Sequence, residues 1–296
     1  MEKISLEQAV REIHEACHHC HEQGKPSPFL LVTGAGVSYP AVPLASTIIE
    51  RCQEKLRQRG ADPKPPAGKD PMSAYSFWMA KTFPQPFQRR EFLAGLIDEQ
   101  RISPANLRLA HLLLAEDREK PTLTNLVITT NFDDHLSRAL RIFGKVHVVC
   151  DHPATTFRIE PDSRTLQLVH VHGTHQYYDC TNLDDEIEKV AGAPADIRSM
   201  SGLIGSLVRS YCPIVIGYGG WGQDVLMRKM SERLTERLPA NLYWFCYSWR
   251  DWEDLQERWP EELLRHPDMR VVLPELTDGD VDRSEAGSLA AGESKV

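Results

Sequence analysis

Three strongly apolar runs lie far apart in the chain, and each ends in residues that can bind or act on a ligand. The runs and the residues after them are 29–33 with Gly34-Ala35-Gly36-Val37-Ser38, 125–130 with Asn131-Phe132-Asp133, and 166–171 with His172-Gly173. Short apolar runs between helical patterns predict buried strands of a parallel sheet, and the carboxyl ends of such strands meet at one crevice. We therefore expect a glycine turn, an amide, a carboxylate and an imidazole in one place. These groups predict a site that holds a dinucleotide and acts on it.

Strand-like and helix-like segments alternate along most of the chain. Further strands are predicted at 145–149, 213–217, 242–247 and 269–273, and helices at 5–23, 43–59, 73–82, 87–98, 103–116, 132–142, 197–211 and 223–237. This alternation predicts an α/β fold with a doubly wound, mostly parallel, Rossmann-like sheet. No strand pattern separates the helices near 73–116, so we expect a helical insertion at about residues 60–120. The Asp, Gly, Ser and Ala content of residues 277–296 predicts a flexible tail or linker after a domain at 1–276.

Composition excludes several classes of protein. Of the 296 residues, 41% are hydrophobic and 26% are charged, which is ordinary for a soluble globular protein. No window approaches the ~18 apolar residues of a membrane span, and the first residues lack a secretory pattern. The formal net charge of −8 argues against nucleic acid as the main partner. Seven scattered cysteines favour reduced thiols, so we expect a cytoplasmic protein.

A second glycine-rich turn follows the strand predicted at 213–217. Gly217-Tyr218-Gly219-Gly220-Trp221-Gly222 fits the Gly-x-Gly-x-x-Gly pattern of dinucleotide-binding oxidoreductases. That pattern needs an acidic ribose ligand at the end of the next strand, about 20 residues on. The next strand is predicted at 242–247, and no acid follows until Asp251. We therefore interpret the second turn as part of the floor of the crevice that the first turn opens.

The N-terminal helical pattern contains an apparent zinc-protease signature. His14-Glu15-Ala16-Cys17-His18 matches His-Glu-x-x-His. Helical periodicity, however, puts the buried stripe at Leu6, Val10, Ile13, Cys17 and Cys20, with Glu15 and His18 on the opposite face. A catalytic zinc needs a dry, shaped cavity. We expect a surface histidine cluster and no metal site.

Asn131 and His172 each have a structural interpretation and a functional one. Asn131 could cap a helix that begins at Phe132, and His172 could be a turn residue before Gly173. Their order after the first glycine turn favours the functional interpretation for both.

The combined pattern resembles the sirtuin family. That family reads Gly-Ala-Gly-x-Ser, then Thr-Gln-Asn-x-Asp, then His-Gly, and this chain is similar over about residues 28–273. The resemblance implies that residues 1–276 form an NAD-binding catalytic domain. It implies catalytic roles for Asn131, His172 and Asp133. It also implies nucleotide contacts for Gly34, Ala35, Gly36, Val37, Ser38, Thr130, Gly217, Tyr218, Gly219 and Asp224.

The chain also departs from protein-deacylating sirtuins. Their two Cys-x-x-Cys pairs are missing, since residues 174–246 hold only the isolated Cys180, Cys212 and Cys246. Their Phe-Gly-Glu segment has no counterpart, and only Pro43 remains of Gly-x-Pro-Asp-Phe-Arg. This reduced pattern resembles the sirtuin-like effector domains of bacterial anti-phage systems, which consume NAD with water as the acceptor.

The resulting hypothesis is an NAD⁺ hydrolase that cleaves the nicotinamide–ribose bond, whose transition state resembles an oxocarbenium ion. Asn131 would position a water or a ribose hydroxyl, and His172 would accept a proton, as an imidazole can near neutral pH. Asp133 would hold a ribose hydroxyl or stabilise positive charge. The diphosphate would lie on backbone amides of residues 34–38 and on a following helix N-terminus.

Two other classes of function stay open at this point. The chain could be a zinc-free, NAD-dependent protein deacylase, or a sensor that binds NAD or ADP-ribose without catalysis. Because uncontrolled NAD loss is toxic, we expect regulation by homo-oligomerisation or by a protein partner, with contacts at residues 73–116 or beyond Thr277. The sequence does not distinguish NAD from NADP.

Overall fold

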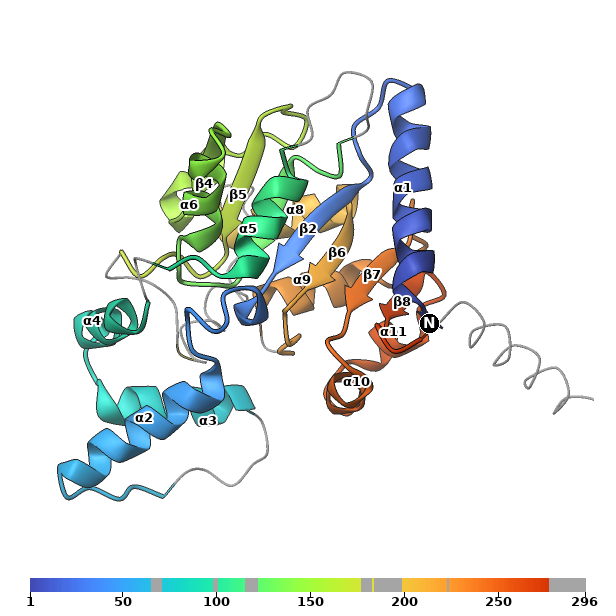
Figure 1. Ribbon diagram of the computed structural model, residues 1–296. Coiled ribbons are helices and arrows are strands. Elements are labelled where there is room, and N and C mark those ends of the chain that lie inside the picture. Colours follow the sequence, from blue (N-terminus) through green and yellow to red (C-terminus); the bar gives the residue numbers. More distant parts are fainter. Residues whose placement is uncertain are drawn as a thin grey trace, which may run out of the picture.

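The computed structural model describes residues 1–64, 71–97, 101–114, 122–176, 183, 199–222 and 224–276. Its centre is an eight-stranded sheet in the order β1-β8-β7-β6-β2-β3-β5-β4 (Figure 1). All neighbouring strands are parallel. The predicted α/β, doubly wound, Rossmann-like sheet is therefore confirmed. Cys180 and the predicted tail at 277–296 lie outside the described residues.

The strands are β1 (Glu2–Ile4), β2 (Phe29–Thr33), β3 (Leu126–Thr129), β4 (His147–Cys150), β5 (Leu166–His170), β6 (Cys212–Ile216), β7 (Leu242–Phe245) and β8 (Met269–Val272). The helices are α1 (Leu6–Glu22), α2 (Ala45–Gln58), α3 (Pro71–Thr82), α4 (Pro86–Leu96), α5 (Pro104–Leu112), α6 (His135–Ile142), α8 (Met200–Ser210), α9 (Val225–Arg233), α10 (Trp249–Gln256) and α11 (Glu261–Arg265). Two 3₁₀ turns are η1 (Ala35–Val37) and η2 (Pro153–Arg158). The sequence patterns missed β1, both 3₁₀ turns, α10 and α11.

The sheet is buried on both faces, and side chains alternate between them. Leu30 and Val32 of β2 point into a core that includes α8, α9, α10 and α11. Phe29 and Leu31 point into a second core, shared with α1, α5 and α6. This two-residue alternation is the geometry of a strand covered on both sides. It explains why β2 is apolar throughout.

Helices α2, α3 and α4 form a separate group beyond the carboxyl ends of the strands, and we call it the helical group (Figure 1). It has its own core, with Cys52 and Leu56 of α2, Trp78 and Met79 of α3, and Leu93 of α4. In contrast, α5 packs into the sheet core. The group thus begins and ends earlier than the insertion predicted at about 60–120.

Helix α1 tests the interpretation of the histidine cluster. His14, Glu15 and His18 are exposed, as predicted. Leu6 and Val10, however, are 42% and 56% exposed, so their predicted burial is wrong. The buried positions are Ala9 and Cys17, whose small side chains bring the helix close to the sheet and leave a narrow contact stripe. The described residues contain no group of three metal-binding side chains arranged to share an ion.

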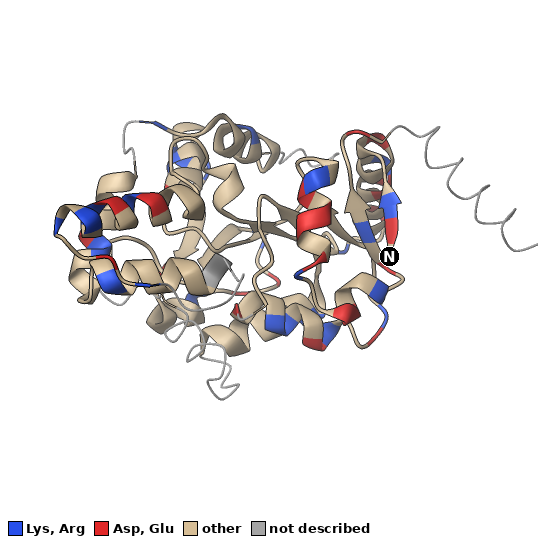
Figure 2. Cartoon of the chain, turned by 90° about the horizontal axis from the view of Figure 1, so that it is seen from below, with Lys and Arg blue, Asp and Glu red and all other residues tan. Residues whose placement is uncertain are grey.

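Charged residues of both signs are intermixed over the helical group and around the sheet (Figure 2). The predicted lack of nucleic-acid binding stays a prediction. Among the helices that the structure describes, none has the length and apolar character that crossing a bilayer requires.

Candidate active site

The two glycine turns lie side by side because β2 and β6 are neighbours at the point where the strand order reverses. This is where open α/β sheets bind ligands. The Gly36 amide donates to the Gly217 carbonyl at 3.0 Å. A Cβ atom on Gly34 would lie 2.5 Å from the Cα of Tyr218. The first turn therefore needs glycine so that the second can pack against it.

This packing corrects one expectation about phosphate binding. Of the five amides from Gly34 to Ser38, four donate to backbone carbonyls, namely those of Gly34, Gly36, Val37 and Ser38. Helix α2 begins only at Ala45, so its N-terminus does not follow the turn directly. The expected row of available amides is therefore wrong for four of these positions. Ala35 and Ser38 are the residues of this turn that line a cavity.

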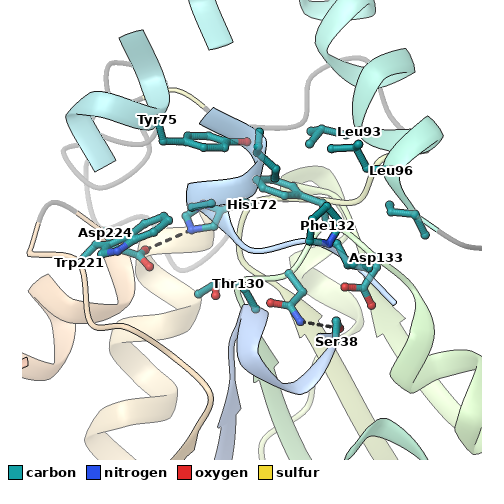
Figure 3. Close-up of a pocket in the computed structure, with 17 residues that line it drawn as sticks. Ser38, Tyr75, Leu93, Leu96, Thr130, Phe132, Asp133, His172, Trp221 and Asp224 are labelled. Carbon is teal, nitrogen blue, oxygen red and sulfur yellow. Dashed lines mark hydrogen bonds and ion pairs between the residues drawn. The ribbon is translucent and has the colours of Figure 1, made fainter. Parts of the chain in front are cut away.

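The cavity lies between the strand ends and the helical group, and its volume is about 800 Å³, including open space at its mouth. One side, the polar wall, consists of Ser38, Thr130, Asn131, Asp133, His172 and Asp224. The other side, the apolar wall, consists of Val42, Pro43, Ala45, Ile48, Tyr75, Leu93, Leu96, Ile97, Phe132 and Trp221. The close-up in Figure 3 shows both sets around one space.

Asn131 is fixed by the first glycine turn. Its Nδ2 donates to the Gly34 carbonyl at 3.1 Å and to Ser38 Oγ at 3.0 Å. A carbonyl can only accept, so the amide nitrogen must face this side. The remaining polar atom, Oδ1, is the one that Asn131 can offer to a ligand as an acceptor. Helix α6 begins at His135, so the interpretation of Asn131 as a helix cap is wrong.

The loop after β3 is also held from behind by two histidines that the sequence analysis missed. His170 Nδ1 donates to the Asn131 carbonyl, and His175 Nδ1 to the Phe132 carbonyl, each at 3.0 Å. Burial lowers the pKa of His170 and outweighs the opposing effects of the Asn131 carbonyl and nearby aspartates. The ring is therefore neutral at neutral pH. For His170, the sequence signal for this role was a histidine inside an otherwise apolar strand.

His172 and Asp224 form a buried pair in the polar wall (Figure 3). His172 Nε2 lies 3.3 Å from Asp224 Oδ1, and the Tyr218 hydroxyl donates to Asp224 Oδ2 at 2.5 Å. Burial raises the pKa of Asp224, but the charge and hydrogen bond of His172, with the bonds from Tyr218 and the Leu226 amide, outweigh it and lower the pKa. Burial, together with Asp224, raises the pKa of Tyr218 well above its usual value. Asp224 is thus an anion and Tyr218 a neutral donor.

Asp133 lies across the cavity from this pair in Figure 3 and is 5% exposed. One of its oxygens, Oδ1, accepts from the His135 amide at 3.0 Å. This bond fixes the carboxylate at the start of α6. The second oxygen, Oδ2, can accept from a ligand hydroxyl.

The structure brings seven of the predicted site residues into the cavity wall: Ala35, Ser38, Thr130, Asn131, Asp133, His172 and Asp224. Six others do not line the cavity: Gly34, Gly36, Val37, Gly217, Tyr218 and Gly219. Sequence reasoning missed Tyr75, Phe132 and Trp221 as part of the wall. Their aromatic side chains carry no motif and are placed by tertiary packing.

Fold and cavity together define an α/β protein with a candidate ligand site at the switch point of a parallel sheet. Residues 125–266 match the family model described as a SIR2-like domain. This segment includes Asn131, Asp133, His172, the second glycine turn and Asp224. The match supports a sirtuin-like domain and an NAD-related activity. A comparison with curated proteins found no match.

Proposed function

We propose that this chain hydrolyses NAD⁺ at the nicotinamide–ribose bond and releases nicotinamide and ADP-ribose. The observation that carries the proposal is the polar wall, in which an amide acceptor and a buried His–Asp pair line one cavity. The family match and the strand-end position support NAD as the ligand. The loss of the Cys-x-x-Cys pairs and of the Phe-Gly-Glu segment supports water as the acceptor.

The reaction needs little acid catalysis. Nicotinamide leaves with the electron pair of the C–N bond and becomes neutral, and positive charge develops on the ribose as in glycoside hydrolysis. A water that donates a hydrogen bond to Asn131 Oδ1 directs a lone pair towards the ribose carbon. Its oxygen bonds to that carbon, and its second proton passes to His172 and then to solvent.

The Asp224 carboxylate positions the His172 ring and stabilises the imidazolium that forms, as a buried aspartate does in hydrolytic triads. Tyr218 fixes the second oxygen of this carboxylate, so the pair cannot rotate freely. We therefore assign Asp224 to positioning and not to the direct nucleotide contact expected at first. Asp133 would hold a ribose hydroxyl.

The diphosphate is assigned to the Ala35 amide and the Ser38 hydroxyl. The apolar wall would enclose the rest of the nucleotide and exclude other water. Thr130 completes the nucleotide contacts. Gly34, Gly36, Val37, Gly217, Tyr218 and Gly219 would support these contacts from behind.

The test compares NAD loss in the wild type with that in Asn131→Ala and His172→Ala. We expect each variant to lose at least about 100-fold in turnover, the usual contribution of a positioned proton acceptor or orienting group. Asn125→Ala, at the opposite end of β3, and His14→Ala, on the exposed face of α1, are matched controls that should keep wild-type turnover. Unchanged turnover in both site variants contradicts the assigned mechanism. Free lysine from an acylated peptide would select the deacylase, and saturable binding without products the sensor.

Regulation belongs to the same proposal. Constitutive NAD loss would kill the cell, so an anti-phage effector of this type would act only after assembly into an oligomer or contact with a partner. Residues 73–116 and the segment beyond 277 are the proposed contact regions. NAD turnover measured across a range of protein concentrations should rise more steeply than linearly. A monomer that is fully active alone contradicts this regulation.

A further inference from the structure

Asn106 joins the start of α5 to the first glycine turn from a position 68 residues away. It is 1% exposed. Its Nδ2 lies 3.2 Å from Ser38 Oγ, 3.2 Å from the Val37 carbonyl and 3.1 Å from Ser103 Oγ. Because the Val37 carbonyl can only accept, the amide nitrogen of Asn106 faces the turn.

These bonds determine what Ser38 can do. Its Oγ accepts from Asn106 Nδ2 at 3.2 Å and from Asn131 Nδ2 at 3.0 Å. A serine hydroxyl has two acceptor lone pairs and one proton. Both lone pairs are occupied, so Ser38 can meet a ligand only as a donor.

The Asn106 side chain is not needed to complete the hydrogen bonding of its other two neighbours, Ser103 Oγ and the Val37 carbonyl. The Ser103 hydroxyl already donates to the Val37 carbonyl, and Ser103 Oγ already accepts from the Asn106 backbone amide at the start of α5. An apolar side chain at 106 would therefore leave both groups bonded. The contact that only the Asn106 side chain supplies is the one with Ser38.

The direction of the Ser38 proton matters because the turn offers few other donors. Four of its five amides are used within the backbone. No lysine or arginine is present among the described residues that line the cavity. An anionic oxygen at this wall must therefore find neutral donors, and a hydroxyl whose lone pairs are already used can offer its proton with little reorganisation when the ligand binds.

We propose that Asn106 is a positioning residue that orients the Ser38 hydroxyl as a donor to an oxygen of the bound nucleotide, on its diphosphate or ribose. The inference rests on the proposed function, because it takes the nucleotide as the ligand. It adds to the site a residue from α5 that contacts neither the reacting atoms nor the ligand.

The test is a double-mutant cycle on ADP-ribose binding, measured by calorimetry with Asn106→Asp, Ser38→Ala and the double variant. An aspartate at 106 has the same shape but only accepts, so it draws the Ser38 proton away from the cavity. Each single variant should bind ADP-ribose about tenfold more weakly or worse, as expected for one donor to a charged group. The double variant should lose no more than either single variant, since both remove the same bond.

Asn106→Ala separates this role from a purely structural one. A structural role makes alanine worse than aspartate, because alanine leaves a cavity. The positioning role makes aspartate worse than alanine for binding, because alanine frees the Ser38 proton without capturing it. Asn125→Asp introduces the same charge change at the far end of β3 and should bind as the wild type does. Melting temperatures of all variants show how much of each effect is folding.

The outcomes distinguish this inference from the proposed function. Additive losses, or wild-type affinity in Asn106→Asp, overturn the inference alone. Wild-type protein that binds ADP-ribose but never consumes NAD overturns the hydrolysis, while a non-additive cycle would still support the role of Asn106. Wild-type protein that binds neither nucleotide overturns both.

Discussion

The two walls of the cavity are built in different ways. In the polar wall, Asn131 and Ser38 are held by hydrogen bonds between segments far apart in the chain. Asp133 and Asp224 are each held by a hydrogen bond from a residue nearby in the sequence. The apolar wall comes largely from helices that have their own core. We therefore infer that the sheet provides fixed chemistry, whereas the helical group provides enclosure. Changes in the polar wall should therefore alter turnover, and changes in the apolar wall should alter binding.

The largest effect is expected for Asp224→Asn. The amide keeps the shape but loses the negative charge that orients and stabilises the His172 ring. We expect kcat to fall about 100- to 1,000-fold with a small change in melting temperature. Asp254→Asn, on the exposed face of α10, is the matched control. If kcat falls by less than about threefold, catalysis does not depend on the pairing of His172 with Asp224.

Two glycine substitutions compare the elements that carry the two walls by their effect on the free energy of unfolding. Gly34 lies in the turn next to the polar wall, and Gly95 lies in α4, which contributes to the apolar wall. Gly34→Ala forces a Cβ to within 2.5 Å of the Tyr218 backbone, which should cost about 2–3 kcal/mol of unfolding free energy. Gly95→Ala in α4 meets nothing within 4 Å and should stabilise the protein by about 0.5–1 kcal/mol. Urea unfolding measures both. Equal effects at the two positions would contradict the close packing of the glycine turns.

Leu96→Ala tests enclosure by the apolar wall. Removing this side chain should raise the KM for NAD about three- to tenfold and leave kcat within a factor of three, because it removes contacts made equally in ground and transition states. Leu6→Ala on α1, at a position that is 42% exposed, is the control. A loss confined to kcat would place Leu96 in the chemistry, and the comparison of the walls would fail.

The smallest effect is expected in the pH dependence of the melting temperature. It comes from His170, which supports the polar wall through its bond to the Asn131 carbonyl. Burial lowers the pKa of His170 in the folded state, so the unfolded state binds more protons below about pH 6.5. Burial of the neutral His170 ring therefore makes its full contribution to the free energy of unfolding above that pH. The contribution is lost as the pH falls and the unfolded state binds the proton. Asp133, Asp134 and Asp151 oppose the shift without cancelling it. The melting temperature should drop by a few degrees from pH 7.5 to 5.5.

His170→Asn keeps a donor for the Asn131 carbonyl but does not titrate. Its melting temperature should therefore change less over the same pH range. Identical pH dependence in the variant and the wild type would show that His170 is not the group responsible.

Most of the sheet could be predicted because its strands are short, apolar and separated by clear helical patterns. β1 could not, since three residues carry no periodicity and the strand exists through its pairing with β8. Leu6 and Val10 were misplaced for a related reason. Helical periodicity indicates a face, but tertiary packing decides how wide a face is buried.

The candidate site was predictable where polar residues end apolar strands, as for Asn131 and His172. The pairing of His172 with Asp224 was not, because it depends on the neighbouring positions of β5, β3, β2 and β6 in the sheet. The same is true of Asn106, which lies in an ordinary helical pattern. Four amides of the first glycine turn donate within the backbone because this turn packs against the second one. Neither motif alone could predict that packing.

Hydrolysis of NAD⁺ is tested most directly by chromatography of the nucleotide products after incubation of the purified protein with NAD⁺. We expect nicotinamide and ADP-ribose in equal amounts from the wild type. Asn131→Ala and His172→Ala should form both products at least about 100-fold more slowly. Intact NAD⁺ at every protein concentration, or a product that joins ADP-ribose to an acceptor other than water, would contradict hydrolysis.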